Sequence, residues 1–262
     1  MRSTNSDDYQ HLPMPIVAMA KSFPAGHVTR QHRHPRDQLL YAVKGIMRLN
    51  TETDTWIVPP SVAVYIPAQL SHNIIMHNAV EMRSLYIDHE RAGCFSSPSP
   101  RVIKVSPLLS ELIQSLTQAS LKLRATSRFK LISSLVALEI EEACDLDLFV
   151  PLPKDKRLQL LCLTLLQDPS DGRTLDEWSE TIGASPRTLA RLFQKELGMG
   201  FGPWRQRVRF HHALENLASG MPISKVAKLS GYNSPSAFTS AFKGIMGFRP
   251  SQSISQMSKI LD

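Results

Sequence analysis

The sequence predicts an α+β multidomain chain: an N-terminal β-barrel or sandwich, a helical segment, and a C-terminal all-α domain with two helix-turn-helix units. Three observations lead to this prediction. Short apolar and alternating runs fill residues 15–90, amphipathic helical patterns follow, and two segments near the C-terminus repeat one another. The length of 262 residues allows one large domain or two ordinary ones.

The first part of the chain has the pattern of many short strands. Residues 1–12 are polar and are interpreted as a flexible tail. Residues 13–95 contain the runs QLLYAV, IMRLN, TWIV, VAVYIP, HNIIMH and MRSLYI, several of them bounded by Gly, Pro or Asn. Close spacing of short strands is typical of a small barrel or sandwich. We expect this region to be one effector-binding domain.

Leucine-rich helical stripes follow at residues 101–145. Leu112 and Leu135 represent two such stripes, which a small barrel alone would not cover. We therefore expect this segment to form helices that make the protein a homodimer. Residues 146–153 are interpreted as a linker, and residues 154–262 as helical throughout.

The C-terminal repeat predicts two helix-turn-helix units. Residues 175–198 align with residues 223–247, so that each copy has a short helix, a glycine turn and a second helix that a Ser-Pro pair opens. Serine caps a helix by accepting a backbone N–H bond, and proline suits the first helical position. An ordinary pair of helical hairpins is the alternative, but it does not require cap, turn and apolar face to recur together. The aligned pairs are Gly183 with Gly231, Ser185 with Ser234, Leu189 with Phe238, and Phe193 with Phe242.

Charge is distributed unevenly between the two halves. Residues 1–150 carry 15 Lys and Arg against 14 Asp and Glu, a net charge of +1, whereas residues 151–262 carry 15 against 9, a net charge of +6. Basic charge on the half with the repeat is what binding to phosphate requires. Seven of the nine histidines lie before residue 90.

Composition also indicates the compartment. Cys94, Cys144 and Cys162 are scattered, which fits a reducing environment rather than a disulfide framework. The chain has no apolar run long enough to span a membrane, and its first residues lack the apolar core of a signal peptide. We expect a cytoplasmic protein with no membrane partner.

Specific motifs resemble those of a known family. GYNSPSAFTSAFKGIMGFRP in the second copy and SPRTLARLFQKELG in the first resemble the DNA-binding domain of AraC/XylS transcription regulators, with the resemblance strongest over residues 154–250. The N-terminal part is similar to the cupin-type regulatory domain of one branch. The resemblance implies a cupin-like barrel, a helical dimerisation segment and a seven-helix DNA-binding domain. Its implied partners are double-stranded promoter DNA, a small-molecule effector and a second copy, and contact with RNA polymerase stays open.

In similar proteins the second helix of each unit enters the major groove. Arg187 and Arg191 suit guanine contacts in the first copy, and Ser240 stands where many relatives carry Arg. We therefore expect the first copy to dominate specificity. Arg205, Arg207 and Arg209 are expected to divide between phosphate contacts and exposed salt bridges. The residues expected at the DNA are Ser185, Arg187, Thr188, Arg191, Ser234, Ser236, Ala237, Ser240, Lys243 and Arg249.

Histidines in the N-terminal part have the spacing of the cupin motifs. GHVTRQHRHPRDQLLYAVKG matches the first motif with Gln38 in place of the usual Glu, and IPAQLSHNII approximates the second. Residues 32, 34 and 38 share parity and so share one face of an extended strand. A divalent transition metal could bind His32, His34, Gln38 and His72. A metal-free pocket in which His32, His34, Gln38, Tyr41 and His72 bind an organic effector is favoured, because glutamine lacks the carboxylate charge.

A ligand-responsive, sequence-specific transcription regulator without catalytic residues is the favoured function. A cupin metalloenzyme with an accessory DNA-binding domain is the alternative from another class, and Gln38 argues against it. A ligand-independent architectural DNA binder is a third hypothesis, which the polar pocket in the N-terminal part disfavours.

Overall fold

The computed structural model describes residues 5–60, 62–93, 97–119, 126–146, 149–218, 220–246 and 249–251. The chain divides into two compact units. The first consists of Met1–Thr51 and Val58–Asp147, and the second of Glu52–Ile57 and Leu148–Asp262. The first unit is rich in β-structure and the second in helices, so the predicted fold class is confirmed.

An antiparallel sheet forms the centre of the first unit, with strand order β1-β7-β2-β5-β8. Strands β3 and β6 pair with each other in the same unit. Residues 101–104 were expected to belong to the helical segment, but they form β8, because Val102 and Ile103 are buried where the strand pairs with β5. The strand bounds are β1 (Ile16–Phe23), β2 (Asp37–Lys44), β3 (Met47–Asn50), β5 (Val62–Ile66), β6 (Asn73–Met76), β7 (Val80–Ile87) and β8 (Arg101–Lys104).

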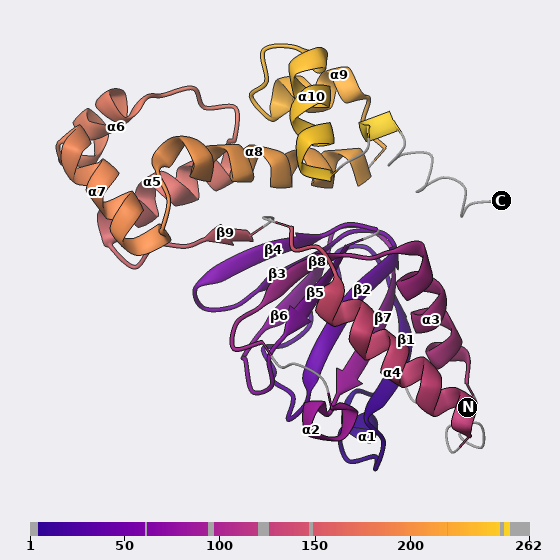
Figure 1. Ribbon diagram of the computed structural model, residues 1–262. Coiled ribbons are helices and arrows are strands. Elements are labelled where there is room, and N and C mark those ends of the chain that lie inside the picture. Colours follow the sequence, from indigo (N-terminus) through magenta and orange to yellow (C-terminus); the bar gives the residue numbers. More distant parts are fainter. Residues whose placement is uncertain are drawn as a thin grey trace. The chain divides into compact units, whose positions relative to one another are not determined.

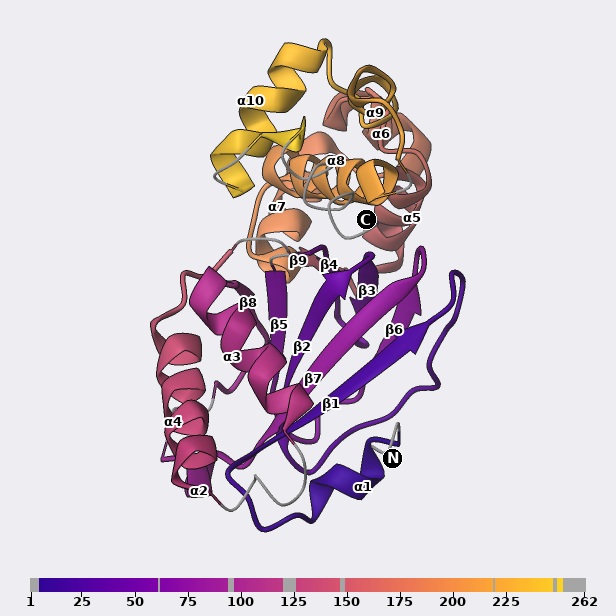
Figure 2. The ribbon, with the colours of Figure 1, turned by 90° about the vertical axis from the view of Figure 1, so that its right-hand side faces the viewer.

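Two helices cover one face of this sheet, α3 (Pro107–Gln118) and α4 (Ser127–Glu142) (Figure 2). Ser106 and Thr126 cap them through their side-chain oxygens. The core between helices and sheet includes Leu39, Leu85 and Ile113. On the outer face of α4, three leucines stay exposed, namely Leu131, Leu135 and Leu138.

The N-terminal segment is attached to the first unit. Residues 1–12 were expected to be a flexible tail, but α1 (Asp7–Gln10) lies among them, and Tyr9 is buried. The buried guanidinium of Arg36 donates hydrogen bonds to the carbonyls of Gln10 and Met14, at 2.8 and 2.9 Å. A buried arginine needs such acceptors, and this segment supplies them. A second short helix, α2 (His89–Ala92), follows β7.

The second unit begins earlier in the chain than the sequence indicated. Residues 146–153 were interpreted as a linker, yet β9 (Phe149–Pro151) pairs there with β4 (Asp54–Val58). Val150 is fully buried in the helical core, and the indole nitrogen of Trp204 donates to the Pro151 carbonyl at 2.9 Å. Val150 and Pro151 therefore belong to the C-terminal unit.

In the described ranges, six helices make up the rest of this unit (Figure 1). Helix α8 runs past both helical pairs: Trp204 and Val208 belong to the core around α6 and α7, while Phe210 packs on Phe242 of α10 with ring centroids 5.4 Å apart. The helices are α5 (Lys156–Gln167), α6 (Leu175–Ile182), α7 (Pro186–Leu197), α8 (Phe201–Ala218), α9 (Ile223–Leu229) and α10 (Pro235–Met246).

Candidate functional site

The two helix-turn-helix units have the local geometry that the repeat predicts. Gly183 ends α6 at φ 71°, and Gly231 follows α9 at φ 73°, a left-handed conformation that glycine adopts without a Cβ penalty. Ser185 accepts the backbone N–H of Thr188 at 3.2 Å, and Ser234 accepts that of Ala237 at 3.1 Å. These caps fix where α7 and α10 begin.

Helix α7 presents two arginines to solvent. Leu189 and Phe193 are fully buried on one side, whereas Arg187 and Arg191 are exposed on the other. Within the described part of the chain, neither arginine makes a hydrogen bond or an ion pair. Thr188 is half-buried, and its hydroxyl lies 2.9 Å from the Ser185 hydroxyl, so it supports the cap. The two free guanidinium groups can therefore reach an external partner.

Helix α10 presents a less charged surface. Phe238 and Phe242 are buried, and the hydroxyls of Ser234 and Ser236 lie 2.9 Å apart at the start of the helix. Small side chains and one lysine face outward here, where α7 carries arginines. The exposed positions expected at the DNA are Ser236, Ala237, Ser240, Lys243 and Arg249.

Two arginines of α8 have a different role from the expected one. Arg205 donates to the Arg173 carbonyl at 2.9 Å, and Arg209 donates through Nε to the Pro169 carbonyl at 3.1 Å. Both were expected to meet phosphate or to form exposed salt bridges. In the structure both donate to backbone carbonyls of the segment before α6, because α8 lies alongside that segment.

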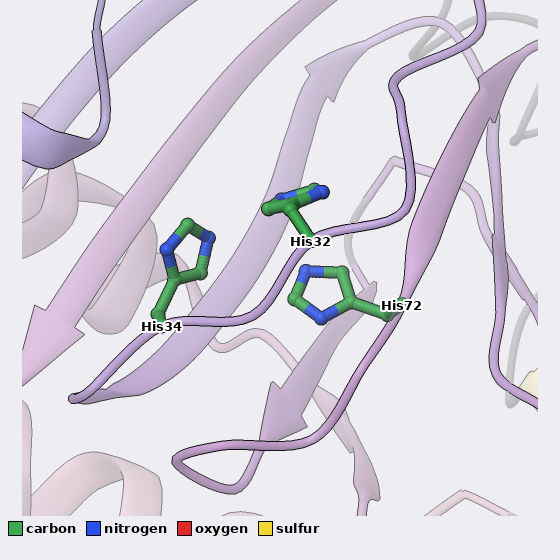
Figure 3. A group of neighbouring side chains, drawn as sticks. All are labelled: His32, His34 and His72. Carbon is green, nitrogen blue, oxygen red and sulfur yellow. The ribbon is translucent and has the colours of Figure 1, made fainter.

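Three histidines of the first unit form one cluster (Figure 3). His32 and His72 pair through their backbones in both directions, at 3.0 and 2.9 Å, and their ring centroids lie 4.4 Å apart. The His34 ring lies 4.8 Å from that of His32 and 5.6 Å from that of His72. One nitrogen from each ring can be chosen so that all lie within 4.8 Å of one another. The expected convergence of these histidines is confirmed.

Hydrogen bonds fix the orientation of two of these rings. The Nδ1 atom of His32 lies 2.8 Å from the Arg30 carbonyl, and that of His72 lies 2.9 Å from the Leu70 carbonyl. A carbonyl accepts only from N–H, so each neutral ring carries its proton on Nδ1 and leaves an Nε2 lone pair. Among the described residues, no hydrogen-bond partner reaches Nε2 of His72 or either ring nitrogen of His34.

Burial keeps two of the rings neutral. His34 and His72 are 4% and 1% exposed. Burial, together with the nearby His32 and His72, lowers the pKa of His34 to about 3. Burial also lowers the pKa of His72 to about 4, although its bond to the Leu70 carbonyl opposes the shift. Neutral imidazole is the form that binds metals.

A cavity of about 790 Å³ adjoins the cluster and is lined by His32, His34 and Gln38. Gln38 donates to the Ser84 hydroxyl at 3.0 Å, while its Oε1 has no partner in the described ranges. Residues outside the two cupin motifs also line the cavity. Alternation along β1 and β7, which places every second side chain on one face, could have indicated Met19, Lys21, Met82 and Tyr86.

Tyr41 does not reach this cavity. It lies on β2 with the opposite parity to Gln38, and its side chain packs in the core between sheet and helices. Its hydroxyl is 3.3 Å from that of Ser110 on α3. The expectation that Tyr41 lines the same pocket as the histidines and Gln38 is wrong, because odd-numbered residues of β2 face the helices.

Comparisons with known proteins match the N-terminal and C-terminal parts of the chain to two different family models. Residues 21–132 match the model of the AraC-like ligand binding domain, and residues 178–256 match that of a helix-turn-helix domain. The transcriptional regulator NimR of Escherichia coli is 29% identical over 87% of this chain and 83% of its own length. The transcriptional regulator RipA of Corynebacterium glutamicum is 38% identical over 38% of this chain and 30% of its own length.

Among solved structures, ToxT from Vibrio cholerae with a bound unsaturated fatty acid aligns with 99% of each chain. Its sequence identity is 11% and its TM-score is 0.40. No helix in the described part of the chain is long and apolar enough to cross a membrane.

Proposed function

Because this chain is an AraC-type transcription regulator, we propose that the small molecule it senses binds in the cavity beside His32, His34 and Gln38. One observation carries this proposal: several buried polar atoms around the cavity lack partners among the described residues. An unpaired buried polar atom is costly, and a ligand that pairs with it removes this cost.

The charge and polarity of the residues that line the cavity indicate which kind of ligand it would bind. Lys21, Arg30 and Arg33 contribute three positive charges to its lining, and Asp7 is the one carboxylate among the described lining residues. Met19 and Met82 add apolar surface. This combination favours a small organic molecule with an apolar body and an anionic or hydrogen-bonding group.

The histidine cluster fits a divalent transition metal. His32, His34 and His72 would supply ring nitrogens and Gln38 an amide oxygen, a donor set that suits zinc, copper, nickel or iron. The carbonyls of Arg30 and Leu70 accept from Nδ1 of His32 and His72 and would hold these two rings in orientation around a metal. A bound ion would satisfy the unpaired ring nitrogens and add positive charge for an anionic effector.

We further propose that the protein has no catalytic activity. A cupin metalloenzyme is the alternative. Gln38 occupies the position of the usual glutamate of the first cupin motif, so the site lacks a carboxylate charge that would strengthen metal binding. Turnover of a bound small molecule by the purified, metal-loaded protein would support the alternative.

On the DNA side, α7 and α10 are proposed as the two recognition helices. Arg187 and Arg191 are exposed one turn apart, with no partner in the described structure, and each can bind guanine through two hydrogen bonds. Serines and Lys243 on α10 suit phosphate and water-mediated contacts. The first helix-turn-helix would then supply most of the sequence preference.

Homodimerisation through α4 is proposed from an exposed leucine stripe. Leu131, Leu135 and Leu138 recur at helical spacing, and Leu131 is 71% exposed. A second copy could bury this stripe against its own. Leu131→Glu should give a folded monomer, whereas Lys130→Glu on the same helix should stay dimeric. A wild-type chain that is monomeric at micromolar concentration and on DNA would contradict the proposal.

Cytoplasmic location and contact with RNA polymerase are proposed from the kind of protein alone.

The experiment for the central function is fluorescence-detected binding of promoter DNA by the purified full-length chain, with and without candidate effectors. DNA affinity that changes with an effector in the wild type, but not in Gln38→Ala, supports the proposed sensing site. An effector response that Gln38→Ala leaves unchanged places sensing elsewhere.

A further inference from the structure

Arg209 of α8 contacts both halves of the DNA-binding unit. Its Nε atom donates to the carbonyl of Pro169, in the segment that precedes the first helix-turn-helix. Its guanidinium also lies against Gly231, the turn glycine of the second. A Cβ added at Gly231 would lie 2.7 to 2.8 Å from Nε, Cζ and Nη2 of Arg209.

Arg205, one turn earlier on α8, binds the same preceding segment. It donates to the carbonyl of Arg173 at 2.9 Å. Thr174 follows directly and caps α6 in a capping box with Glu177, in which each side chain bonds the other residue's backbone N–H. The start of the first helix-turn-helix is therefore tied to α8 at two points.

The two copies of the repeat differ at their turn glycines. Gly183 and Gly231 share the left-handed conformation, with φ 71° and 73°. Among the described residues, nothing lies within 4 Å of a Cβ built at Gly183, whereas Arg209 fills that position at Gly231. Any side chain would strain the backbone equally at the two sites, but only at Gly231 would it also displace an arginine.

We propose that Arg209 is a positioning residue that fixes the second helix-turn-helix relative to the first and so sets the spacing between two DNA elements. The guanidinium of Arg209 is hydrogen-bonded to the segment before α6 and packs on the turn after α9. It can therefore hold these two parts of the DNA-binding unit at a fixed separation. The proposal rests on the proposed reading of DNA by α7 and α10, and it concerns their separation rather than their base contacts.

The test uses the full-length chain and DNA that the wild type selects from a random pool. Affinity is measured for the selected site, for each element alone, and for sites whose elements are moved by one or two base pairs. The wild type should lose affinity by about tenfold on a one-base-pair change, comparable to one mismatched base pair. Arg209→Ala should weaken binding at the native spacing and reduce that spacing penalty to about twofold. Its affinity for each single element should stay near that of the wild type.

Glycine variants supply a matched control. Gly231→Ala should reduce the spacing penalty as Arg209→Ala does, and combining the two should reduce it no further. Gly183→Ala carries the same backbone strain without the arginine contact and should keep the wild-type penalty. Thermal melting confirms folding, and Arg209→Lys replaces Arg209→Ala if the latter does not fold.

The outcomes distinguish failure of the positioning role from failure of the proposed DNA reading by α7 and α10. A full spacing penalty in folded Arg209→Ala, or an equal effect of Gly183→Ala and Gly231→Ala, would overturn the positioning role while DNA reading stands. A wild type that selects no two-element site would instead overturn the proposed reading by both helices, and the positioning role with it.

Discussion

His32 and His72 form an isolated antiparallel bridge in which each backbone N–H donates to the other's carbonyl, at 3.0 and 2.9 Å. The bridge brings together two histidines that lie 40 positions apart in the sequence. It also points both rings to the same side, where His34 joins them (Figure 3). A backbone pairing therefore builds the cluster, and the side-chain bonds to Arg30 and Leu70 orient two of its rings.

Metal binding is expected to depend on this cluster. Protein purified without a histidine tag and dialysed against zinc should retain about one ion per chain, since three neutral imidazoles suffice for a zinc site. His34→Gln and His72→Gln should lose it, whereas His11→Gln, outside the cavity lining, should not. Gln38→Glu should tighten binding by about tenfold or more, because it restores a charged ligand. Equal metal content in the wild type and in His34→Gln would refute the site.

Acid should destabilise the metal-free protein through the same residues. The pKa values of His34 and His72, about 3 and 4 in the folded state, lie below the ordinary value of 6.5. Below pH 6.5 the unfolded chain takes up protons that the folded chain excludes. The unfolding free energy should therefore fall by roughly 1.4 kcal/mol per pH unit for each histidine as pH drops from about 6.5 toward 4.

Urea unfolding in the presence of a chelator measures this dependence. His34→Gln should remove the part of the pH dependence of the unfolding free energy that one histidine contributes. His11→Gln should show the same pH dependence as the wild type. Parallel pH profiles for the wild type and His34→Gln would mean that His34 is protonated as readily in the folded chain as in the unfolded one.

Sequence preference should depend on α7 more than on α10. Arg191→Ala should cost about 1–3 kcal/mol in DNA affinity and relax the preference at one base pair, because a bidentate guanine contact is lost. Ser240→Ala, at an exposed position of α10, should cost much less. Binding-site profiles of both variants provide the comparison, and a larger change for Ser240→Ala would reverse the assignment.

The DNA-binding unit should be more stable when β9 is kept. A fragment of residues 149–262 retains Val150 and the Pro151 carbonyl that binds Trp204, and a fragment of residues 154–262 does not. Loss of one buried valine alone removes about 1.5–3 kcal/mol. We expect the longer fragment to melt at a higher temperature and both to bind DNA more weakly than the full chain. Identical melting temperatures would show that β9 adds no stability in the absence of β4, which both fragments lack.

The local features of the DNA-binding unit could be predicted from the sequence, because they arise within a few residues. Ser185 and Ser234 cap their helices and Gly183 and Gly231 make the turns, as their residue types require. The tertiary role of Arg209 could not be predicted, since its partner Pro169 is 40 residues away. The same holds for β9, which depends on its pairing with β4 and on Trp204.

Strand parity predicts only part of the N-terminal site. It places His32, His34 and Gln38 on one face of a single extended strand, and the structure brings them to one cavity, although His32 and His34 precede β2 and a bend at residues 35–36 separates them from Gln38. The same rule puts Tyr41 on the other face of β2, where it packs beneath α3. Helix α1 could not be predicted from the local sequence, because the distant Arg36 helps to hold it by donating to the carbonyl of Gln10, its last residue.

Selection of DNA from a random pool by the purified full-length chain tests the central claim most directly. Enriched sequences should contain two elements about one helical turn, or roughly 10.5 base pairs, apart, because two recognition helices of one unit reach successive major grooves. The double variant Arg187→Ala and Arg191→Ala should lose the strong preference at the element read by α7 and keep only the weaker preference at the element read by α10. Enrichment of no common sequence, or the same sequences from wild type and double variant, would contradict the account.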